Sequence, residues 1–116
     1  MKRKAKKTIA KKRKEIRYHK VEVICKNGNK KDLWHPAYVF LEKGNVYIYV
    51  SITHSNKVEE MIVIKLKRNP NPKDKRDSYW VVKIKSDTKD RFGKRREGWS
   101  IDENDDQTIR DEYKKR

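Results

Sequence analysis

The chain has 116 residues, of which 34% are hydrophobic and 43% charged, with a formal net charge of +16 at pH 7. That length suggests one small domain, and no apolar segment is long enough to span a bilayer. The single cysteine, Cys25, excludes an intrachain disulfide and fits a reducing compartment, so we expect a soluble, cytoplasmic protein. The positive charge favours a polyanionic partner but carries no sequence specificity.

The N-terminal residues 1–20 hold eleven Lys or Arg and one Glu, a net +10 of the total +16. Like charges spaced four residues apart repel on a helix. We therefore predict a basic arm over residues 1–20 that is disordered, or helical only on a polyanion, followed by one small domain over residues 21–116. The arm could also be a simple solubilising tail.

Five apolar runs follow, and turn signals separate them. The predicted strands are residues 21–25, 34–41, 46–53, 61–67 and 78–85. Asn27-Gly28 is a strong hairpin signal, and Gly44 can take the positive φ of a second turn. Residues 68–77, with two prolines and several charges, read as an exposed loop.

The C-terminal part changes to a helical pattern. Residues 87–99 can hold a short turn or helix that breaks at Gly93 and Gly98. A clear helix follows, with Asp102 as its N-cap, acidic residues in its first turn and basic residues in its last. The sequence therefore predicts a mainly β, α+β fold: a small antiparallel SH3-like barrel or curved sheet of about five strands, then one or two helices.

The two middle strands can be aligned by their own pattern. If the turn centres on Gly44-Asn45, paired residue numbers sum to 89, and one face of the hairpin is fully apolar. That face would carry Ala37, Val39, Leu41, Ile48, Val50 and Ile52. The same register places His35 opposite His54 at the open end of the hairpin.

Two imidazoles with pKa values near neutrality can cleave RNA without a metal ion. One takes the proton of the attacking 2′-hydroxyl, and the other protonates the leaving 5′-oxygen. The alternative is that His35 and His54 are strand-end residues bonded to backbone or water. Three scattered histidines and one cysteine do not make a structural zinc site, so no cofactor or metal is expected.

Basic residues in the second half of the chain alternate with aromatic residues, a mixture that suits single-stranded RNA. Cations hold phosphates there, while rings such as Tyr79, Trp80 and Trp99 stack on bases. Solvated surface charge beside core aromatics is the competing interpretation. The predicted nucleic-acid-binding residues are Lys65, Lys67, Arg68, Lys73, Lys75, Arg76, Arg91, Lys94, Arg95 and Arg96.

Four segments in order resemble the MazF/PemK-like toxin endoribonucleases, over roughly Trp34 to Tyr113. They are "HPAYVFL", "VSITHS", "RDSYWVVKIKSDTKDRFGKR" and "GWSIDENDDQTIRDEY". His35 stands where that family usually has Arg, and Thr53 takes its Thr position. Strict alternation puts Thr53 on the face opposite His35 and His54, so a bulge near the strand end would be needed to join all three.

The resemblance implies an SH3-like barrel, a homodimer and metal-independent cleavage of single-stranded RNA. It implies a separate acidic antitoxin protein as partner, and it adds Thr53 to His35 and His54 as the candidate catalytic residues. No membrane partner is expected. The alternative function is a non-catalytic RNA- or DNA-binding module with residues 1–20 as an electrostatic arm. A nuclease of the barnase/RelE-like class ranks lower, because those folds place helices before the sheet and here the clear helix comes last.

Overall fold

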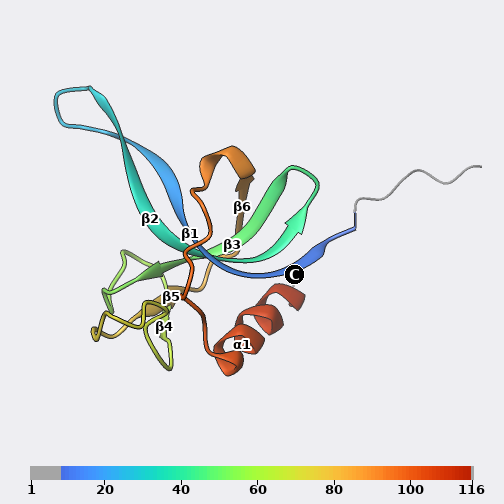
Figure 1. The fold of residues 1–116 in the computed structure, drawn as a ribbon. Helices are drawn as coiled ribbons and strands as arrows, with labels where there is room; N and C mark the ends of the chain where they lie inside the picture. The colour runs from blue at the N-terminus through green and yellow to red at the C-terminus, as the bar shows by residue number, and fades with distance from the viewer. Residues whose placement is uncertain (1–8, 116) are drawn as a thin grey trace, which may run out of the picture.

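A computed structural model describes residues 9–115. In chain order its elements are β1 (Lys11–Ile24), β2 (Lys30–Lys43), β3 (Val46–Thr53), β4 (Val63–Lys65), β5 (Tyr79–Val81), β6 (Lys85–Thr88), the 3-10 turn η1 (Lys89–Arg91) and α1 (Glu103–Lys114). The strands form one antiparallel sheet in the order β1-β2-β3-β5-β4, with β6 also beside β3 (Figure 1). The predicted fold class is confirmed, as a curved open sheet followed by one α-helix.

The N-terminal prediction is wrong for residues 11–20, because Lys11–Lys20 form the first part of β1, which pairs with β2. The strand is stable despite its charge because its polar side chains have partners. Arg13 binds Glu42 of β2, with 2.7 Å between Nε and the carboxylate, while Ile16 is only 1% exposed in the core. The boundary between residues 20 and 21 is therefore not a structural one. Residues 1–8 of the predicted arm lie outside the described residues.

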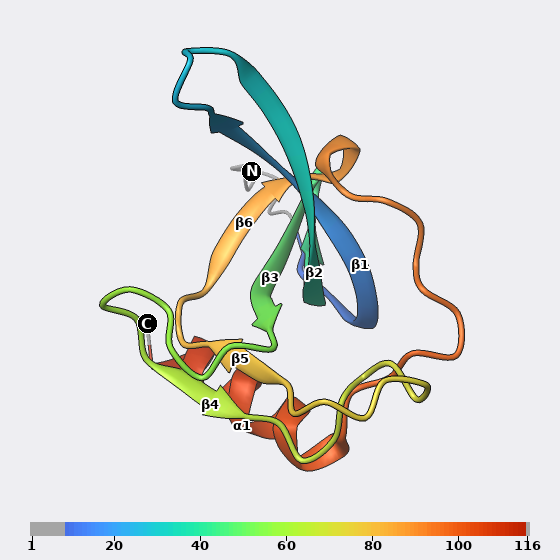
Figure 2. The ribbon, with the colours of Figure 1, turned by 90° about the vertical axis from the view of Figure 1, so that its left-hand side faces the viewer.

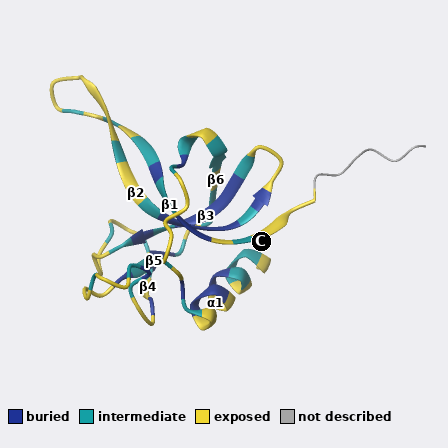
Figure 3. Ribbon diagram, in the orientation of Figure 1, coloured by how far each residue is buried: buried dark blue, intermediate teal, exposed yellow. Residues whose placement is uncertain are grey.

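The hairpin of β1 and β2 is confirmed at Asn27-Gly28. Gly28 has a φ of 85°, and two backbone hydrogen bonds close the turn between Cys25 and Asn29. The far part of this hairpin projects away from the body of the protein (Figures 1 and 2). Its tip is exposed, including Ile24 (Figure 3).

The predicted register of β2 with β3 is correct only for the residue pairs beside the turn. There Leu41 faces Ile48, as predicted. A bulge between Val39 and Leu41 then shifts the pairing by one residue, so that Val39 faces Tyr49 instead of Val50. A shift by one residue moves every following side chain of β2 to the other face of the sheet.

The bulge therefore reassigns the predicted apolar face. One core cluster lies on the face that α1 covers, and it contains Ile16, Tyr38, Phe40, Ile48, Val50, Ile52, Leu66, Trp80, Ile101 and Ile109. A smaller cluster, with Ala37, Val39, Tyr47, Tyr49 and Phe92, lies on the other face. Both faces of β3 are buried (Figure 3). Both faces of the middle of the sheet are thus covered, and sites can form on either side.

The later strands are shorter than predicted. Of residues 61–67, only Val63–Lys65 form β4, and the predicted strand 78–85 is divided into β5 and β6 by a tight turn in which Lys83 N–H donates to the Val81 carbonyl. This division lets the first half of β3 pair with β6 while its last two residues pair with β5.

The C-terminal helix begins as predicted. The Asp102 side chain accepts a hydrogen bond from the backbone N–H of Asn104 at 2.8 Å. Buried Asp106 joins α1 to the sheet by accepting from the hydroxyl of Tyr38 at 2.5 Å and from Arg110. In the described part of the chain, no helix is long and apolar enough to cross a membrane.

Candidate functional site

The structure pairs His35 with a different histidine from the one that the sequence predicted. His35 of β2 lies directly opposite His19 of β1. Side chains that are directly opposite in neighbouring strands point to the same face of the sheet, with Cβ atoms about 5 Å apart. His54 contributes to a cavity on the other face. The predicted pairing of His35 with His54 is therefore wrong, and the histidine opposite His35 is His19.

A cavity of about 270 Å³ lies beside the His19–His35 pair, and we call it the His35 cavity. Its polar lining residues are His19, His35, Ser51 and Lys85. Its apolar lining residues are Val21, Pro36, Ile52, Val58, Met61 and Val81. His35 is exposed to solvent, so one imidazole of the pair is open to a ligand.

His19 is buried and held on several sides. Its Nε2 lies 2.8 Å from Oδ2 of Asp87, and its Nδ1 lies 3.3 Å from the Tyr49 hydroxyl. The ring packs against those of Tyr49 and Phe92, each with 4.7 Å between centroids. Burial acts to raise the pKa of Asp87, but hydrogen bonds from His19 and the backbone of Thr88 lower it overall. Asp87 thus stays ionised and fixes the orientation of the His19 ring.

Lys85 is the cation of the His35 cavity. Burial lowers the pKa of its ammonium group, and the charge of Lys83 lowers it further. Within residues 9–115 no carboxylate forms an ion pair with Lys85, whose Nζ instead lies 5.8 Å from the centre of the Tyr49 ring. A half-buried cation without an anionic partner is unfavourable, and an anionic ligand would relieve that cost.

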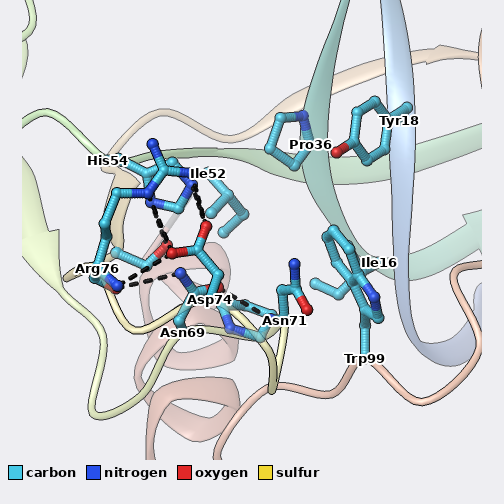
Figure 4. Close-up of a pocket in the computed structure, with 12 residues that line it drawn as sticks. Ile16, Tyr18, Pro36, Ile52, His54, Asn69, Asn71, Asp74, Arg76 and Trp99 are labelled. Atoms are coloured by element: carbon cyan, nitrogen blue, oxygen red, sulfur yellow. Dashed lines mark hydrogen bonds and ion pairs between the residues drawn. The ribbon is translucent and has the colours of Figure 1, made fainter.

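A second cavity, of about 150 Å³, lies on the other face of the sheet, and we call it the His54 cavity (Figure 4). His54 Nδ1 is 3.2 Å from the carbonyl oxygen of Asp77, and its Nε2 is 3.6 Å from Asp74. Arg76 binds Asp74 through two nitrogens, at 2.6 and 3.0 Å, and so holds the pKa of Asp74 well below its usual range. The charge of Arg76 is therefore largely neutralised.

Aromatic residues form the opposite wall of the His54 cavity, as Figure 4 shows for Tyr18 and Trp99. The two rings meet edge to face, with 6.1 Å between centroids. The Arg96 guanidinium lies over both rings, 4.8 Å from the centre of Trp99 and 5.3 Å from that of Tyr18. This wall combines stacking surfaces with a positive charge.

Thr53 does not join either cavity. It pairs with Tyr79 of β5, and its hydroxyl accepts a hydrogen bond from the backbone N–H of Ser55 at 3.1 Å. Had the pairing of β2 with β3 continued in the shifted register, Thr53 would have faced His35. The bulge lies in β2 and not near the end of β3, where it would be needed to join the three residues. The structure therefore does not bring His35, Thr53 and His54 together.

The predicted nucleic-acid-binding residues divide into two groups. Lys65, Arg68, Arg76, Arg91 and Arg95 each lie within 4 Å of a carboxylate oxygen. Lys67, Lys73, Lys75, Lys94 and Arg96 form no ion pair with any described residue. Of the three predicted stacking rings, Trp80 is 1% exposed and belongs to the core, whereas Trp99 remains accessible at a cavity.

The sequence reasoning missed His19 and Lys85. His19 was assigned to the arm, although the Asn27-Gly28 turn carried the necessary signal. If that hairpin is extended, partner numbers sum to 54, and His19 falls opposite His35, as the structure shows. Lys85 had no comparable signal, because its position depends on where the chain turns between β5 and β6.

Within residues 9–115 no group of three or more His, Cys, Asp or Glu side chains is arranged to hold a metal ion. Comparison of the chain with known protein families, with characterised proteins and with solved structures finds no match.

Proposed function

We propose that this protein is a metal-independent endoribonuclease that cleaves single-stranded RNA in the His35 cavity. The observation that carries the proposal is that two histidines from directly opposed strand positions line one cavity with Lys85, whose ammonium group has no carboxylate partner among the described residues. The resemblance to MazF/PemK-like toxins agrees with His35 as a site residue. It also supports a role as the toxin of a type II toxin–antitoxin system, with a separate acidic antitoxin and a homodimeric state.

The cavity has the groups that transesterification of RNA requires. A base takes the proton of the 2′-hydroxyl as its oxygen bonds to phosphorus, and an acid gives a proton to the departing 5′-oxygen. The products are a 2′,3′-cyclic phosphate and a 5′-hydroxyl. We assign one of these proton transfers to exposed His35 and the other to Nδ1 of His19, whose Nε2 is held by Asp87. Lys85 would stabilise the negative charge that builds on the phosphoryl oxygens.

The test is incubation with a long single-stranded RNA in the presence of EDTA, followed by mapping of the new ends. We expect discrete cuts that leave cyclic phosphates. The His35→Ala variant should abolish cleavage and relieve growth arrest on expression, and Lys85→Met should reduce cleavage. Trp34→Leu and Lys26→Met are the matched controls, since both residues are exposed and neither lines the His35 cavity or the cavity that contains His54. The proposal fails if the parent never cuts RNA at any salt concentration, or if His54→Ala abolishes cleavage while His35→Ala does not.

One observation favours the second candidate, a non-catalytic single-stranded RNA-binding module. Both nitrogens of His19 already have protein partners, as is common for a structural histidine. On that reading RNA binds, no cuts appear, and His35→Ala changes nothing. The cleavage assay therefore separates the two candidates.

A further inference from the structure

We propose that the His54 cavity receives one unpaired base of a single-stranded RNA, while Arg96 holds the adjacent phosphate. This inference rests on the proposed RNA ligand but not on cleavage, so it holds equally for a catalytic protein and for a binding module. It assigns a base-binding role to a face of the sheet opposite the one that carries the His35 cavity.

The shape and lining of the cavity suit a single base. Its volume of about 150 Å³ is below the roughly 300–1,000 Å³ typical of sites for drug-sized ligands, so it admits one small ring system. Ile16, Ile52 and Pro36 provide apolar surface, and Tyr18 and Trp99 provide ring faces and edges. Bases that are unstacked from single-stranded RNA commonly bind between such aromatic and apolar side chains.

The polar rim supplies a free donor. The side-chain oxygen of Asn71 accepts a hydrogen bond from the backbone N–H of Lys73 at 3.1 Å, while its amide nitrogen has no partner among the described residues. The amide of neighbouring Asn69 is already used, because it donates to the carbonyl oxygen of Arg76 at 3.1 Å. Asn71 is therefore the residue best placed to donate to the edge of a base.

The rim also avoids a repulsive charge. Asp74 lies at the cavity, and a bare carboxylate there would oppose the approach of a phosphate. Arg76 compensates it through two short hydrogen bonds. The ion pair of Asp74 and Arg76 thus leaves the cavity open to RNA, although Arg76 itself is not available as a phosphate ligand.

Arg96 is the cation that remains available. No carboxylate pairs with it within residues 9–115, whereas its neighbour Arg95 lies 3.9 Å from Glu97. Its guanidinium lies over the rings of Trp99 and Tyr18, and no described residue accepts a hydrogen bond from its side-chain N–H groups, so these groups can bind phosphate. Arg96 also lines two shallow surface hollows that contain Lys94 and Lys73, so the strand can continue over basic surface on either side.

The experiment measures binding of a short single-stranded RNA, and of a ribose-phosphate chain of the same length without bases, by fluorescence anisotropy. All proteins carry His35→Ala so that cleavage does not interfere. We expect Trp99→Leu to weaken binding of the RNA by about 5- to 150-fold, as for the loss of one stacked base, and to leave binding of the base-free chain nearly unchanged. Trp34→Leu is the matched control, because Trp34 is also accessible but lines neither cavity.

Arg96→Gln and Asn71→Ala keep the test valid if Trp99→Leu does not fold. Arg96→Gln should lower the slope of log affinity against log salt by about one, and Arg95→Gln should not. Asn71→Ala should weaken binding of the RNA but not of the base-free chain. The inference is overturned if the parent binds both chains equally, or if the Trp99 and Arg96 variants match their controls. Absence of cleavage would contradict the proposed enzyme and leave these binding results intact.

Discussion

Glu42 at the end of β2 links three elements of the fold through its carboxylate. It accepts a hydrogen bond from Nε of Arg13 in β1 at 2.7 Å and binds Lys89 of η1. The hydrogen bond from Lys89, followed by that from Arg13, lowers the pKa of Glu42 from 4.5 to about 2. A carboxyl whose pKa is depressed by folding stabilises the folded state above its unfolded pKa, and that stabilisation is lost as the pH falls toward the folded pKa.

The size of this contribution follows from the two pKa values. At about 1.4 kcal/mol for each pH unit, the difference gives about 3 kcal/mol near neutral pH, falling to about 1.4 kcal/mol at about pH 3. These are upper values, because the side chain is still 11% exposed. Replacement by the neutral Glu42→Gln should therefore lower the free energy of unfolding by up to about 3 kcal/mol at neutral pH, and by half of that or less at about pH 3.

Urea unfolding of the parent and the variant at both pH values measures this difference, and the other titrating groups cancel in the comparison. Glu22→Gln is the control, since Glu22 is exposed and lies 3.7 Å from Lys30, and such a pair contributes at most about 1 kcal/mol. Equal destabilisation by Glu42→Gln at both pH values would refute the assignment of the stabilisation to the Glu42 charge.

Three further outcomes are expected. Asp102→Ala removes the N-cap of α1 and should lower the free energy of unfolding by about 1 kcal/mol in urea titrations, whereas Glu103→Ala, one residue later, should cost less. Tyr38→Phe removes one hydrogen bond to Asp106 but leaves its pair with Arg110, so a loss of about 1–2 kcal/mol is expected in the same assay, and a neutral result would contradict it. Deletion of residues 1–8, which include five Lys or Arg, should flatten the salt dependence of single-stranded RNA affinity by up to about 3.5 in slope, and an unchanged slope would show that they make no phosphate contacts.

Local signals in the sequence were sufficient for the parts of the fold that depend on a few adjacent residues. The Asn27-Gly28 turn and the Asp102 cap were predicted because each satisfies backbone groups within a few positions. The first part of β1, Lys11–Lys20, was missed because a lysine-rich segment has no strand pattern of its own. It is a strand because Glu42 and the polar groups of α1 supply partners from distant parts of the chain, including the 2.6 Å hydrogen bond from Arg110 to the carbonyl of Arg13.

The site was less predictable than the fold, because successive side chains of a strand point to opposite faces of the sheet. A register error of one residue therefore places every side chain on the wrong face. One bulge between Val39 and Leu41 reversed the faces of the preceding part of β2 and separated His35 from His54. The alternation of Tyr, Val and Phe there is apolar on both faces, so the sequence does not show which one faces α1. A histidine pair remains a candidate for the site only because β1 places His19 opposite His35, on the same face of the sheet.

The two cavities lie back to back, since Pro36 and Ile52 line both of them. A cation without a carboxylate partner among the described residues belongs to each: Lys85 lines the His35 cavity, and Arg96 lies over the aromatic wall of the His54 cavity. Because these cations are on opposite faces and share no partner, Lys85→Met and Arg96→Gln should weaken RNA binding independently, with free-energy changes that add in the double variant. Measured in the His35→Ala protein, additivity would indicate that each cation binds its own phosphate. If Lys85→Met no longer weakens RNA binding once Arg96 is replaced, the two cations must act on the same nucleotide. That result would contradict the prediction, because the two cations lie on opposite faces of the sheet.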